Sequence, residues 1–499
     1  MMTAHGHLGI CTSTTARGGS EEYIIALARW ATSNGWRVTV VMPDVDGVRT
    51  VRDDLRSAGV GLDTIDPPLP GFSECLFPEQ RRRVIDVLRA QRFDRLVIVL
   101  PGIEFGGTLI DAAAVTGIPA VVLYQLAGYP YAISPVERQF YAWARRQRQA
   151  WAAVSIDNRD RLCETIGWAP ESVAVVPNGL LRPVTPPSVE ARQAARAHVR
   201  DLLLAPPDAP VAVTVARLHP QKGVDTWLDA ATSILSTRSD LHLAWIGDGE
   251  LRAEVSDAVR ARGLAGRVHL PGRRTDVDQW LHGSDVFVLP SRFEGCPFAA
   301  LEALAAGCPS VLSDIGPHRE IARPGHEALL VPVQDATMLA ASLARVLDDP
   351  ALARHLSDHG SRRARDFSPE MSFGRLWALL DQASMPPAPP WPSWPLPRTA
   401  PRRRTAIYGV GAGGRVAFDE LHMREDVVAF VDSFHDGSTR TFCDRPVVTP
   451  EALVTIDPDH VVLASCWHPA MRDRLAQVGI PANRVEVFPQ WRLVSIDAA

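Results

Sequence analysis

The sequence predicts an α/β protein whose parallel sheets are covered by helices on both faces. Short apolar runs alternate along the chain with segments in which apolar residues recur at three- and four-residue spacing. An uninterrupted apolar run is typical of a strand that is buried on both faces, and a helical crossover joins two such strands in parallel. The length of 499 residues, at roughly 100–200 residues per domain, indicates about three domains.

The strand and helix signals occur in a regular order. The predicted strands are Val38–Met42, Leu96–Leu100, Ala120–Tyr124, Val173–Val176, Val211–Val215, Leu241–Ile246, Val286–Pro290 and Ser310–Leu312. Helical spacing is clear in Tyr23–Ser33 and Leu251–Arg262. These signals predict two Rossmann-like lobes, over residues 1–179 and 180–366, followed by one more helix over residues 367–383.

A proline-rich stretch over residues 385–404 separates the two lobes from the rest of the chain. Proline at this density neither continues a helix nor enters a central strand, so the stretch is predicted to be a semi-rigid extended linker. Trp391 and Trp394 within it are candidates to pack on a neighbouring lobe. Residues 405–499 then restart a pattern of strand, glycine-rich turn and helix, which predicts a small Rossmann-like α/β domain.

The composition is ordinary for a globular protein, with 46% hydrophobic and 22% charged residues. A net charge of −5 gives no reason to expect nucleic acid as a partner. No apolar stretch approaches the length of a membrane span, and the first residues lack the pattern of a signal peptide. We therefore expect a cytoplasmic protein, for which contact with a membrane surface stays open.

The cysteine pattern also favours a cytoplasmic protein. The seven of them form no C-x-x-C pair, which argues against zinc ribbons and dithiol redox motifs. An odd number of scattered cysteines in a long chain fits a reducing compartment better than a disulfide framework.

The strongest motif is a pair of glutamates, Glu294 and Glu302, in the segment EGCPFAALE. Because the segment follows an apolar strand and opens a helix, Glu294 is predicted to lie in a turn at the carboxyl end of a strand, where parallel sheets bind ligands. Glu302 would lie about two turns into the helix, on the same face. Two carboxylates so placed can hold hydroxyls of a sugar or a ribose, and the backbone N–H groups at the helix start offer a site for phosphate.

The second motif is a pair of cations, Arg217 and Lys222, in the turn that follows the strand Val211–Val215. Together they can hold a diphosphate, and contacts that strengthen as a pyrophosphate departs would lower a reaction barrier. A charge pair at ~4 Å and an effective dielectric of ~20 is worth roughly 4 kcal/mol. The alternative is a surface turn with two solvated charges.

Weaker signals surround these two motifs. They are Gly18-Gly19-Ser20-Glu21 before the first long helix, Pro177-Asn178-Gly179 between the lobes, and Gly247-Asp248-Gly249 after a strand. In their order and spacing, the GGxE, PNG, R-x4-KG, GxG and E-x7-E segments resemble the large retaining glycosyltransferase family 4 over residues 6–383. The resemblance implies the two-lobed GT-B fold, with an acceptor-side first lobe, a donor-binding second lobe, and a closing helix over residues 367–383 that crosses back to the first lobe.

The resemblance also implies roles for individual residues. Arg217 and Lys222 would bind the diphosphate of a nucleoside-diphosphate sugar and stabilise its leaving charge, and Glu294 would contact the donor sugar. No metal and no further cofactor are expected, because the two cations replace the metal. The implied donor-binding residues are Gly18, Gly19, Gly247, Arg273, Arg274, Gly295, Cys296, Pro297, Phe298, Ala299 and Glu302.

One position departs from the family pattern. Family members often carry a histidine near the donor sugar and acceptor in the segment that here reads Tyr124-Gln125-Leu126-Ala127-Gly128. Gln125 can form hydrogen bonds but cannot act as an acid or base at neutral pH. The donor sugar, its base and the acceptor are therefore not identified by the sequence.

The last domain carries a G-x-G-x-x-G pattern at Gly409, Gly411 and Gly414, between a strand and a helix, with Asp432 at the end of the next strand. This spacing is typical of dinucleotide binding, in which the acid holds a ribose. The segment also resembles the nucleotide-binding module of bacterial sugar acyltransferases and sugar-modifying proteins. Because too few residues follow for a catalytic half, a structural or regulatory module is favoured, and a bound dinucleotide or nucleotide sugar is the alternative.

The segment Glu137–Trp151 combines four arginines with aromatic residues, as interfacial membrane helices do. We favour instead a helix that packs Phe140, Trp143 and Trp151 onto the sheet. For the whole chain, two functions remain to be separated: transfer of a sugar with retention of anomeric configuration, and non-catalytic binding of a nucleotide sugar. The intact set of charges favours catalysis.

Overall fold

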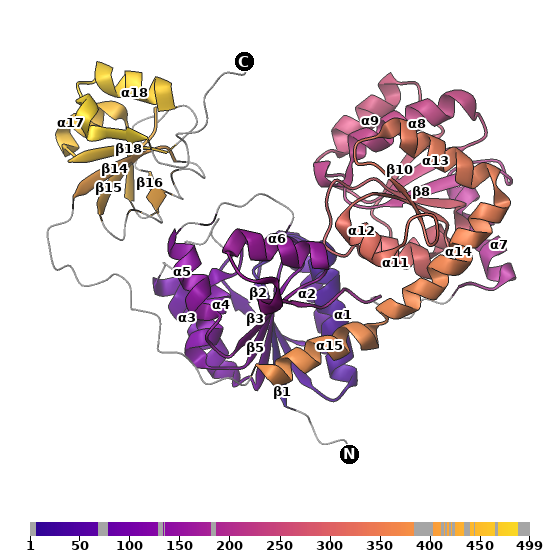
Figure 1. Cartoon of the computed structure of the whole chain (residues 1–499), viewed down its shortest axis with the longest axis horizontal. Helices are drawn as coiled ribbons and strands as arrows, with labels where there is room; N and C mark the ends of the chain where they lie inside the picture. The colour runs from indigo at the N-terminus through magenta and orange to yellow at the C-terminus, as the bar shows by residue number, and fades with distance from the viewer. Residues whose placement is uncertain are drawn as a thin grey trace.

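The computed structural model describes the chain in several stretches. These are residues 6–67, 78–127, 133, 135–180, 186–383, 403–410, 414, 417–418, 421, 425–433, 440–443, 445–464 and 468–487. The described backbone forms three sheets flanked by helices (Figure 1). The α/β class and the Rossmann-like parallel sheets that the apolar runs predict are therefore confirmed.

The first sheet is parallel throughout and has the strand order β3-β2-β1-β4-β5-β6-β7. Its strands are β1 (His7–Cys11), β2 (Arg37–Pro43), β3 (Gly61–Ile65), β4 (Arg95–Leu100), β5 (Ala120–Tyr124), β6 (Gln149–Ala153) and β7 (Ala174–Val175). The helices between them are α1 (Gly19–Ser33), α2 (Arg49–Ser57), α3 (Pro78–Gln91), α4 (Gly107–Thr116), α5 (Pro135–Ala144) and α6 (Ile156–Ile166). Residues 96–100 of β4 are fully buried, which explains why this strand is one continuous apolar run.

The second sheet is also parallel, with the order β10-β9-β8-β11-β12-β13. Its strands are β8 (Val211–Val215), β9 (His242–Ile246), β10 (Val268–Gly272), β11 (Val286–Leu289), β12 (Ser310–Ser313) and β13 (Leu329–Val331). The helices are α7 (Val189–Leu202), α8 (Val224–Thr237), α9 (Arg252–Ala261), α10 (Val277–Gly283), α11 (Phe298–Ala305), α12 (Gly316–Ile321), α13 (Ala336–Asp348) and α14 (Pro350–Ala364). Strands β8 and β11 are neighbours in the middle of this sheet, so the loops that follow them emerge side by side.

After α14, the chain returns from the second lobe to the first through helix α15 (Pro369–Gln382) (Figure 1). The return is fixed by aromatic packing, because the Trp377 ring lies 5.1 Å from that of Trp30 and 5.3 Å from that of Trp36. Phe373 adds a contact of 5.6 Å with the Tyr23 ring. The apolar face seen in the sequence of this helix thus packs against α1 and against Trp36, which follows α1 in the first lobe.

The third sheet has the order β16-β17-β15-β14-β18-β19, and only β16 runs antiparallel to its neighbour. Its strands are β14 (Arg404–Tyr408), β15 (Asp426–Val431), β16 (Thr441–Phe442), β17 (Arg445–Val448), β18 (His460–Leu463) and β19 (Val485–Val487), with helices α17 (Leu453–Ile456) and α18 (His468–Gln477). The predicted linker, with Trp391 and Trp394, lies outside the described residues except for its last two positions.

The segment Glu137–Trp151 is not one helix, and that prediction is wrong. Helix α5 ends at Ala144, and Trp151 lies in β6, which pairs with β5. Residues 149–153 pair with β5 on one side and with β7 on the other, so their backbone groups form sheet hydrogen bonds rather than helical ones. Phe140, Trp143 and Trp151 are nevertheless buried in the first lobe, as expected.

Among the helices of the described stretches, none combines the length and apolar character that a membrane span requires.

Candidate active site

The loops after β8 and β11 are locked together at their backbones. Gly223 has a left-handed φ of +65°, and a Cβ atom on it would lie 2.1 Å from the Pro290 carbonyl oxygen, so only glycine fits. Gln221 also connects the two loops. Its Nε2 donates to the Phe293 carbonyl at 3.0 Å, and its carbonyl accepts from the Arg292 N–H at 2.8 Å. This packing brings Lys222 to the carboxyl end of the neighbouring strand.

The side chains of Lys222 and Glu294 are in direct contact between these two loops. The Lys222 Nζ lies 2.5 Å from Glu294 Oε1, and their side chains are only 15% and 5% exposed. Ser291 Oγ donates to the same carboxylate oxygen at 2.7 Å. The sequence predicts a shared site for these two charged residues, and they are in contact, 72 positions apart in the chain.

A neutral histidine lies close to this pair. His318 is fully buried, and its Nδ1 donates to the Ser313 carbonyl at 2.7 Å, since a carbonyl oxygen can only accept. Burial lowers the pKa of His318; the Glu294 charge raises it and the Lys222 charge lowers it, and the net shift is downward. The imidazole is therefore uncharged near neutral pH and does not compete with Lys222 for Glu294.

The backbone of the Glu294 loop touches the first lobe. Asn158 Nδ2 donates to the Glu294 carbonyl at 3.0 Å, and Asn178 Nδ2 donates to the Cys296 carbonyl at 2.9 Å. A Cβ atom on Gly295 would lie 1.9 Å from the Gln125 carbonyl oxygen, so the two lobes approach here at backbone distance. The loop that carries Glu294 is thus part of the contact between the lobes.

Gln125 belongs to this contact. Its Oε1 accepts from Asn178 Nδ2 at 3.0 Å, and the side chain is buried. Its Nε2 has no hydrogen-bond partner among the described residues. The Gln125 side chain therefore positions Asn178, which in turn donates to the Cys296 carbonyl of the second lobe, and it retains one donor of its own.

A charged residue of the second lobe makes a further contact between the lobes. Both oxygens of Glu320, on α12, accept from the first turn of α6, at 2.8 Å from the Ile156 N–H and 2.9 Å from the Asp157 N–H. A carboxylate at a helix N-terminus satisfies free N–H groups and opposes the helix dipole favourably. A cavity of about 140 Å³ lies between the lobes here, lined in part by Glu320, Cys296 and Arg375.

Arg217, the other predicted cation, is exposed and forms no ion pair with any residue in the described stretches. It lies close enough to the buried Glu21 for its charge to act on that carboxyl group. Burial raises the pKa of Glu21, while hydrogen bonds and the Arg217 charge oppose the rise. Glu21 Oε2 accepts from the Gly18 N–H at 2.5 Å, so this carboxylate holds the glycine turn at the start of α1 in place.

The glycine turn faces the start of α11. A Cβ atom on Gly19 would lie 3.5 Å from the Phe298 ring, so the first-lobe turn and the second-lobe helix are in contact range. Pro297 is the N-cap of α11, and Ala299 lies half-buried in its first turn. Glu302 is half-buried in the second turn of α11.

Cys296 does not offer a reactive thiol. It is 5% exposed, and burial raises its pKa to about 12. Since the thiolate is the nucleophilic form, this residue serves packing.

The turns after β9 and β10 are held by protein partners. A Cβ atom on Gly247, which has a φ of +141°, would lie 1.9 Å from the Ala216 carbonyl oxygen. Arg273 reaches Glu22 of the first lobe at 3.2 Å, and Arg274 forms two bonds of 2.8 Å with Asp276. The guanidinium groups of the β10 turn are thus paired with carboxylates.

In the third sheet, the described glycines of the G-x-G-x-x-G pattern pack closely. A Cβ atom on Gly414 would lie 1.9 Å from the Gly409 carbonyl oxygen, so position 414 requires glycine. Asp432 follows β15 and lies 3.6 Å from Arg440. Gly411 lies outside the described residues.

Four residues of this arrangement were not singled out as site residues from sequence: Ser291, Asn158, Asn178 and Glu21. Asn178 and Glu21 lie inside the PNG and GGxE segments, so a signal for them existed. Ser291 and Asn158 carry none, because an isolated polar residue after a strand or in a helix is common.

Comparison with known proteins matches both lobes. Residues 17–180 match the family described as Glycosyltransferase Family 4, and residues 196–363 match the family described as Glycosyl transferases group 1. The D-inositol 3-phosphate glycosyltransferase of Thermobispora bispora is 31% identical over 46% of this chain and 55% of its own length. The UDP-Gal:alpha-D-GlcNAc-diphosphoundecaprenol alpha-1,3-galactosyltransferase of Escherichia coli is 28% identical over 48% of this chain and 63% of its own length. The chain thus covers less than two thirds of each of these relatives.

Solved structures share the two-lobed GT-B fold. A glycosyltransferase from Rickettsia africae ESF-5 superposes with a TM-score of 0.63 at 15% identity, over 76% of this chain and 99% of its own. HepE of Anabaena, in complex with UDP-glucose, superposes with a TM-score of 0.61 at 18% identity, over 76% of this chain and 100% of its own. At these identities the likeness establishes the fold.

Proposed function

Starting from a chain whose two matched lobes are of the glycosyltransferase family 4 and group 1 type on a GT-B fold, we propose that it transfers a sugar from a nucleoside diphosphate to an acceptor. Transfer proceeds with retention of anomeric configuration and without a metal ion. The two cations after β8 provide the positive charge that a metal would otherwise supply to the diphosphate.

The observation that carries this proposal is the Lys222–Glu294 contact. Lys222 is the only lysine among the 52 Lys and Arg residues of the chain. An arginine would form a rigid fork with Glu294, whereas an ammonium is a compact charge that turns easily from one oxygen to another. A chain that uses arginine everywhere else keeps lysine where the cation must change partner.

The proposed exchange of partners follows from this. Without donor, Lys222 neutralises Glu294 at 2.5 Å. When a diphosphate enters, the ammonium turns to its oxygens together with Arg217, and Glu294 is released to accept from hydroxyl groups of the donor sugar. Glu302 then holds the ribose, and the turn around Gly18 and Gly19 covers the phosphates.

In the reaction, the bond from the anomeric carbon to the diphosphate oxygen breaks first, and the electron pair leaves with the diphosphate. The departing oxygen takes the proton of the acceptor hydroxyl, whose oxygen bonds to the anomeric carbon on the same face. Lys222 and Arg217 stabilise the charge on the leaving group, which is the contribution that preorganised charges make in a site shielded from water.

A uridine nucleotide is the first donor base to test. HepE of Anabaena binds UDP-glucose, and the Escherichia coli relative is named for UDP-galactose. A thermal-shift panel of UDP-, GDP-, ADP- and TDP-sugars identifies the donor, since a ligand at 100 times its dissociation constant adds about 2.7 kcal/mol of stability. With that donor, the configuration of the product is read by NMR, and the rate is measured with and without EDTA.

The alternative, a protein that binds a nucleotide sugar without turnover, predicts a thermal shift with neither transfer nor hydrolysis of the donor. An inverted product would refute retention, and a rate abolished by EDTA and restored by a divalent cation would refute metal independence.

The single lysine allows a direct test of the exchange. Reductive methylation with ¹³C-formaldehyde labels only Lys222 and the terminal amine, so that the terminal signal is an internal reference. We expect the Lys222 methyl resonance to move when a nucleoside diphosphate binds. A donor that binds and leaves this resonance unchanged would exclude contact between Lys222 and the diphosphate.

For the third domain we propose a structural or regulatory role. The close Gly409–Gly414 packing supports a helix start shaped for a nucleotide, while Asp432 already faces Arg440. Titration of the full chain with NAD and with the identified nucleotide sugar decides the matter. Binding of one equivalent of nucleotide sugar and of no NAD supports the proposal. Binding of a second equivalent of nucleotide sugar that is lost in Asp432→Ala refutes it.

A further inference from the structure

Three histidines of the second lobe gather at one place outside the site described above. His355 and His359 lie one helical turn apart on α14, and His326 lies in the turn between α12 and β13. One ring nitrogen from each lies within 4.8 Å of the other two. The ring centres are 4.2 Å apart for His326 and His359, and 4.2 Å apart for His355 and His359. Histidines at positions i and i+4 of a helix present two imidazoles to one metal ion.

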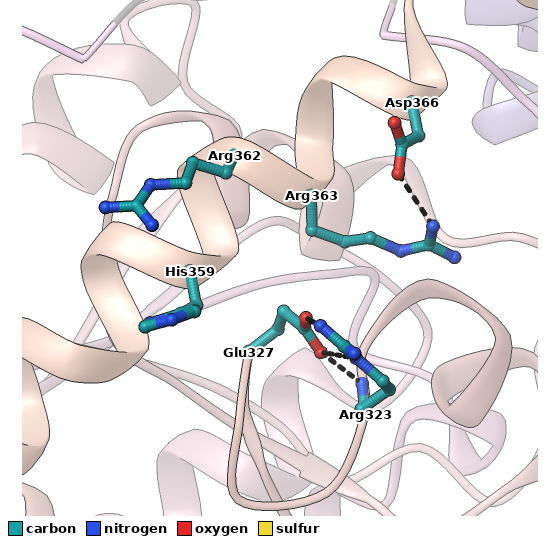
Figure 2. Close-up of a pocket in the computed structure, with 6 residues that line it drawn as sticks. All are labelled: Arg323, Glu327, His359, Arg362, Arg363 and Asp366. Carbon is teal, nitrogen blue, oxygen red and sulfur yellow. Dashed lines mark hydrogen bonds and ion pairs between the residues drawn. The ribbon is translucent and has the colours of Figure 1, made fainter.

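The neighbours of these rings fix which nitrogens are free. His359 Nδ1 lies 2.8 Å from the His355 carbonyl oxygen. A carbonyl oxygen only accepts, so Nδ1 carries the proton and Nε2 has its lone pair available. Figure 2 shows the His359 side chain projecting from α14 on the side of the loop that carries Arg323 and Glu327.

His326 has a carboxylate behind it. Its Nδ1 lies 3.1 Å from Oε1 of Glu327, whose side chain is 2% exposed. Glu327 is held in turn by Arg323, through the backbone N–H at 2.7 Å and Nε at 3.0 Å. A carboxylate that accepts from one ring nitrogen orients the other toward a metal and makes it more basic.

Arg323 does not disturb this arrangement. Its NH2 lies 3.3 Å from the same Nδ1, but it also bonds to Glu327 (Figure 2). The charge of the guanidinium is therefore balanced by the buried carboxylate at its side.

We infer that His326, His355 and His359 form a binding site for a divalent transition metal ion, with Zn²⁺ as the best match. Three imidazoles suit Zn²⁺, Co²⁺, Ni²⁺ and Cu²⁺. Bonds of about 2.0–2.1 Å in tetrahedral geometry place ligand nitrogens roughly 3.3 Å apart. Ligand atoms already within 4.8 Å reach that spacing by small side-chain rotations, and the exposed His355 is free to make them. Water or an external ligand fills the fourth position.

The position of the site separates it from sugar transfer. His326 precedes β13, whereas Glu294 follows β11. Because the strands are parallel, the two residues lie at opposite ends of the strands. The metal would join the turn before β13 to α14, the helix that leads through η5 (Arg365–Phe367) into α15. The beginning of the return to the first lobe would thereby be fixed, and the ion would stabilise the fold rather than take part in the chemistry.

Beside the histidines lies a hollow of about 470 Å³, lined by Arg323, Glu327, His359, Arg362, Arg363 and Asp366 (Figure 2). It gives solvent and small ligands access to one side of His359. The open fourth coordination position is therefore consistent with the surroundings.

The test uses the full chain without a polyhistidine tag. Isothermal titration with Zn²⁺ is expected to show one equivalent bound, and Co²⁺ is expected to give the visible absorption of a tetrahedral ion. His359→Ala and His326→Ala each remove a ligand and should weaken binding by more than the roughly 10- to 100-fold that is typical when an outer-shell partner is lost. The matched control is His198→Ala, an exposed histidine on α7 that should leave Zn²⁺ binding unchanged.

Because His355 is exposed, His355→Ala is expected to keep the metal-free melting temperature, so that a loss of binding in this variant cannot come from misfolding. Zn²⁺ should raise the melting temperature of the unaltered chain and not that of the triple variant. Equal Zn²⁺ affinity in the unaltered chain and the triple His326→Ala/His355→Ala/His359→Ala variant would overturn the inference.

Discussion

The Lys222 ammonium lies 2.5 Å from Glu294 Oε1, with both side chains largely withdrawn from solvent. An ion pair of this kind is weak evidence of a role in stability, because the desolvation of two charges offsets much of their attraction. Its two members come instead from loops at the carboxyl ends of adjacent strands, where α/β sheets bind ligands. The position of the pair therefore fits a ligand site better than a structural ion pair.

Removal of either cation should reduce turnover. Lys222→Met and Arg217→Met are each expected to lower kcat by on the order of 10²-fold or more, because each removes a charge that stabilises the leaving diphosphate. Arg260→Met, at an exposed arginine of α9, is the matched control and should keep the unaltered rate. Steady-state kinetics with the identified donor provide the measurement; unchanged kcat in both cation variants would end the proposed mechanism.

Neutralisation of Glu294 should also reduce turnover, and loss of its neighbour should do so less. Glu294→Gln is expected to lower kcat by on the order of 10²-fold, since an amide holds sugar hydroxyls less strongly than a carboxylate does. Ser291→Ala removes one hydrogen bond to Oε1 and is expected to cost about tenfold. Ser236→Ala, on the surface of α8, is the control. An effect of Ser291→Ala larger than that of Glu294→Gln would contradict this assignment of roles.

A methyl group at the contact between the lobes should destabilise the protein. In Gly295→Ala, the added carbon meets the Gln125 carbonyl oxygen at 1.9 Å, and a backbone atom cannot rotate away. The melting temperature and kcat should both fall. Gly374→Ala adds the same methyl group on α15, where nothing lies within 4 Å, and should be neutral or stabilising by up to about 1 kcal/mol. Equal melting temperatures for the two variants would show that the lobes separate freely at Gly295.

Stability should fall in mild acid because of a partly buried pair of histidines, His242 and His269. His269 Nε2 lies 3.0 Å from His242 Nδ1, and burial, followed by the His242 charge, lowers the pKa of His269 from 6.5 to about 4. Above pH 6.5 the ring is unprotonated in both the folded and the unfolded chain, so the folded state incurs no penalty for excluding a proton and stability is at its full value. As the pH falls from 6.5 to about 4, the unfolded chain takes up a proton that the folded chain excludes, and stability is lost.

Melting temperatures measured between pH 7 and pH 4.5 should therefore decline, and His269→Gln should decline less steeply. The exposed His198 supplies the control through His198→Gln. The same acid dependence in His269→Gln and the unaltered chain would exclude His269 as a source of this sensitivity.

The α/β class, the positions of strands such as β4, β8 and β11, and the candidate cations and carboxylates follow from the sequence by itself, because each depends on local patterns. A run such as residues 96–100 is apolar throughout because both of its faces are buried, and Lys222 and Glu294 each follow such a run. The boundary of α5 could not be read in this way. Residues 145–151 carry helix-compatible side chains, and only pairing with β5 decided that Trp151 lies in a strand.

The tertiary structure decided which side chains meet. Lys222 and Glu294 are in contact because β8 and β11 are neighbours in the sheet, an order that no local pattern encodes. The same is true of Gln125 with Asn178, and of His326 with the histidine pair on α14. Sequence patterns record the surroundings of each residue along its own strand or helix, whereas partners distant in the chain are chosen by how whole elements pack.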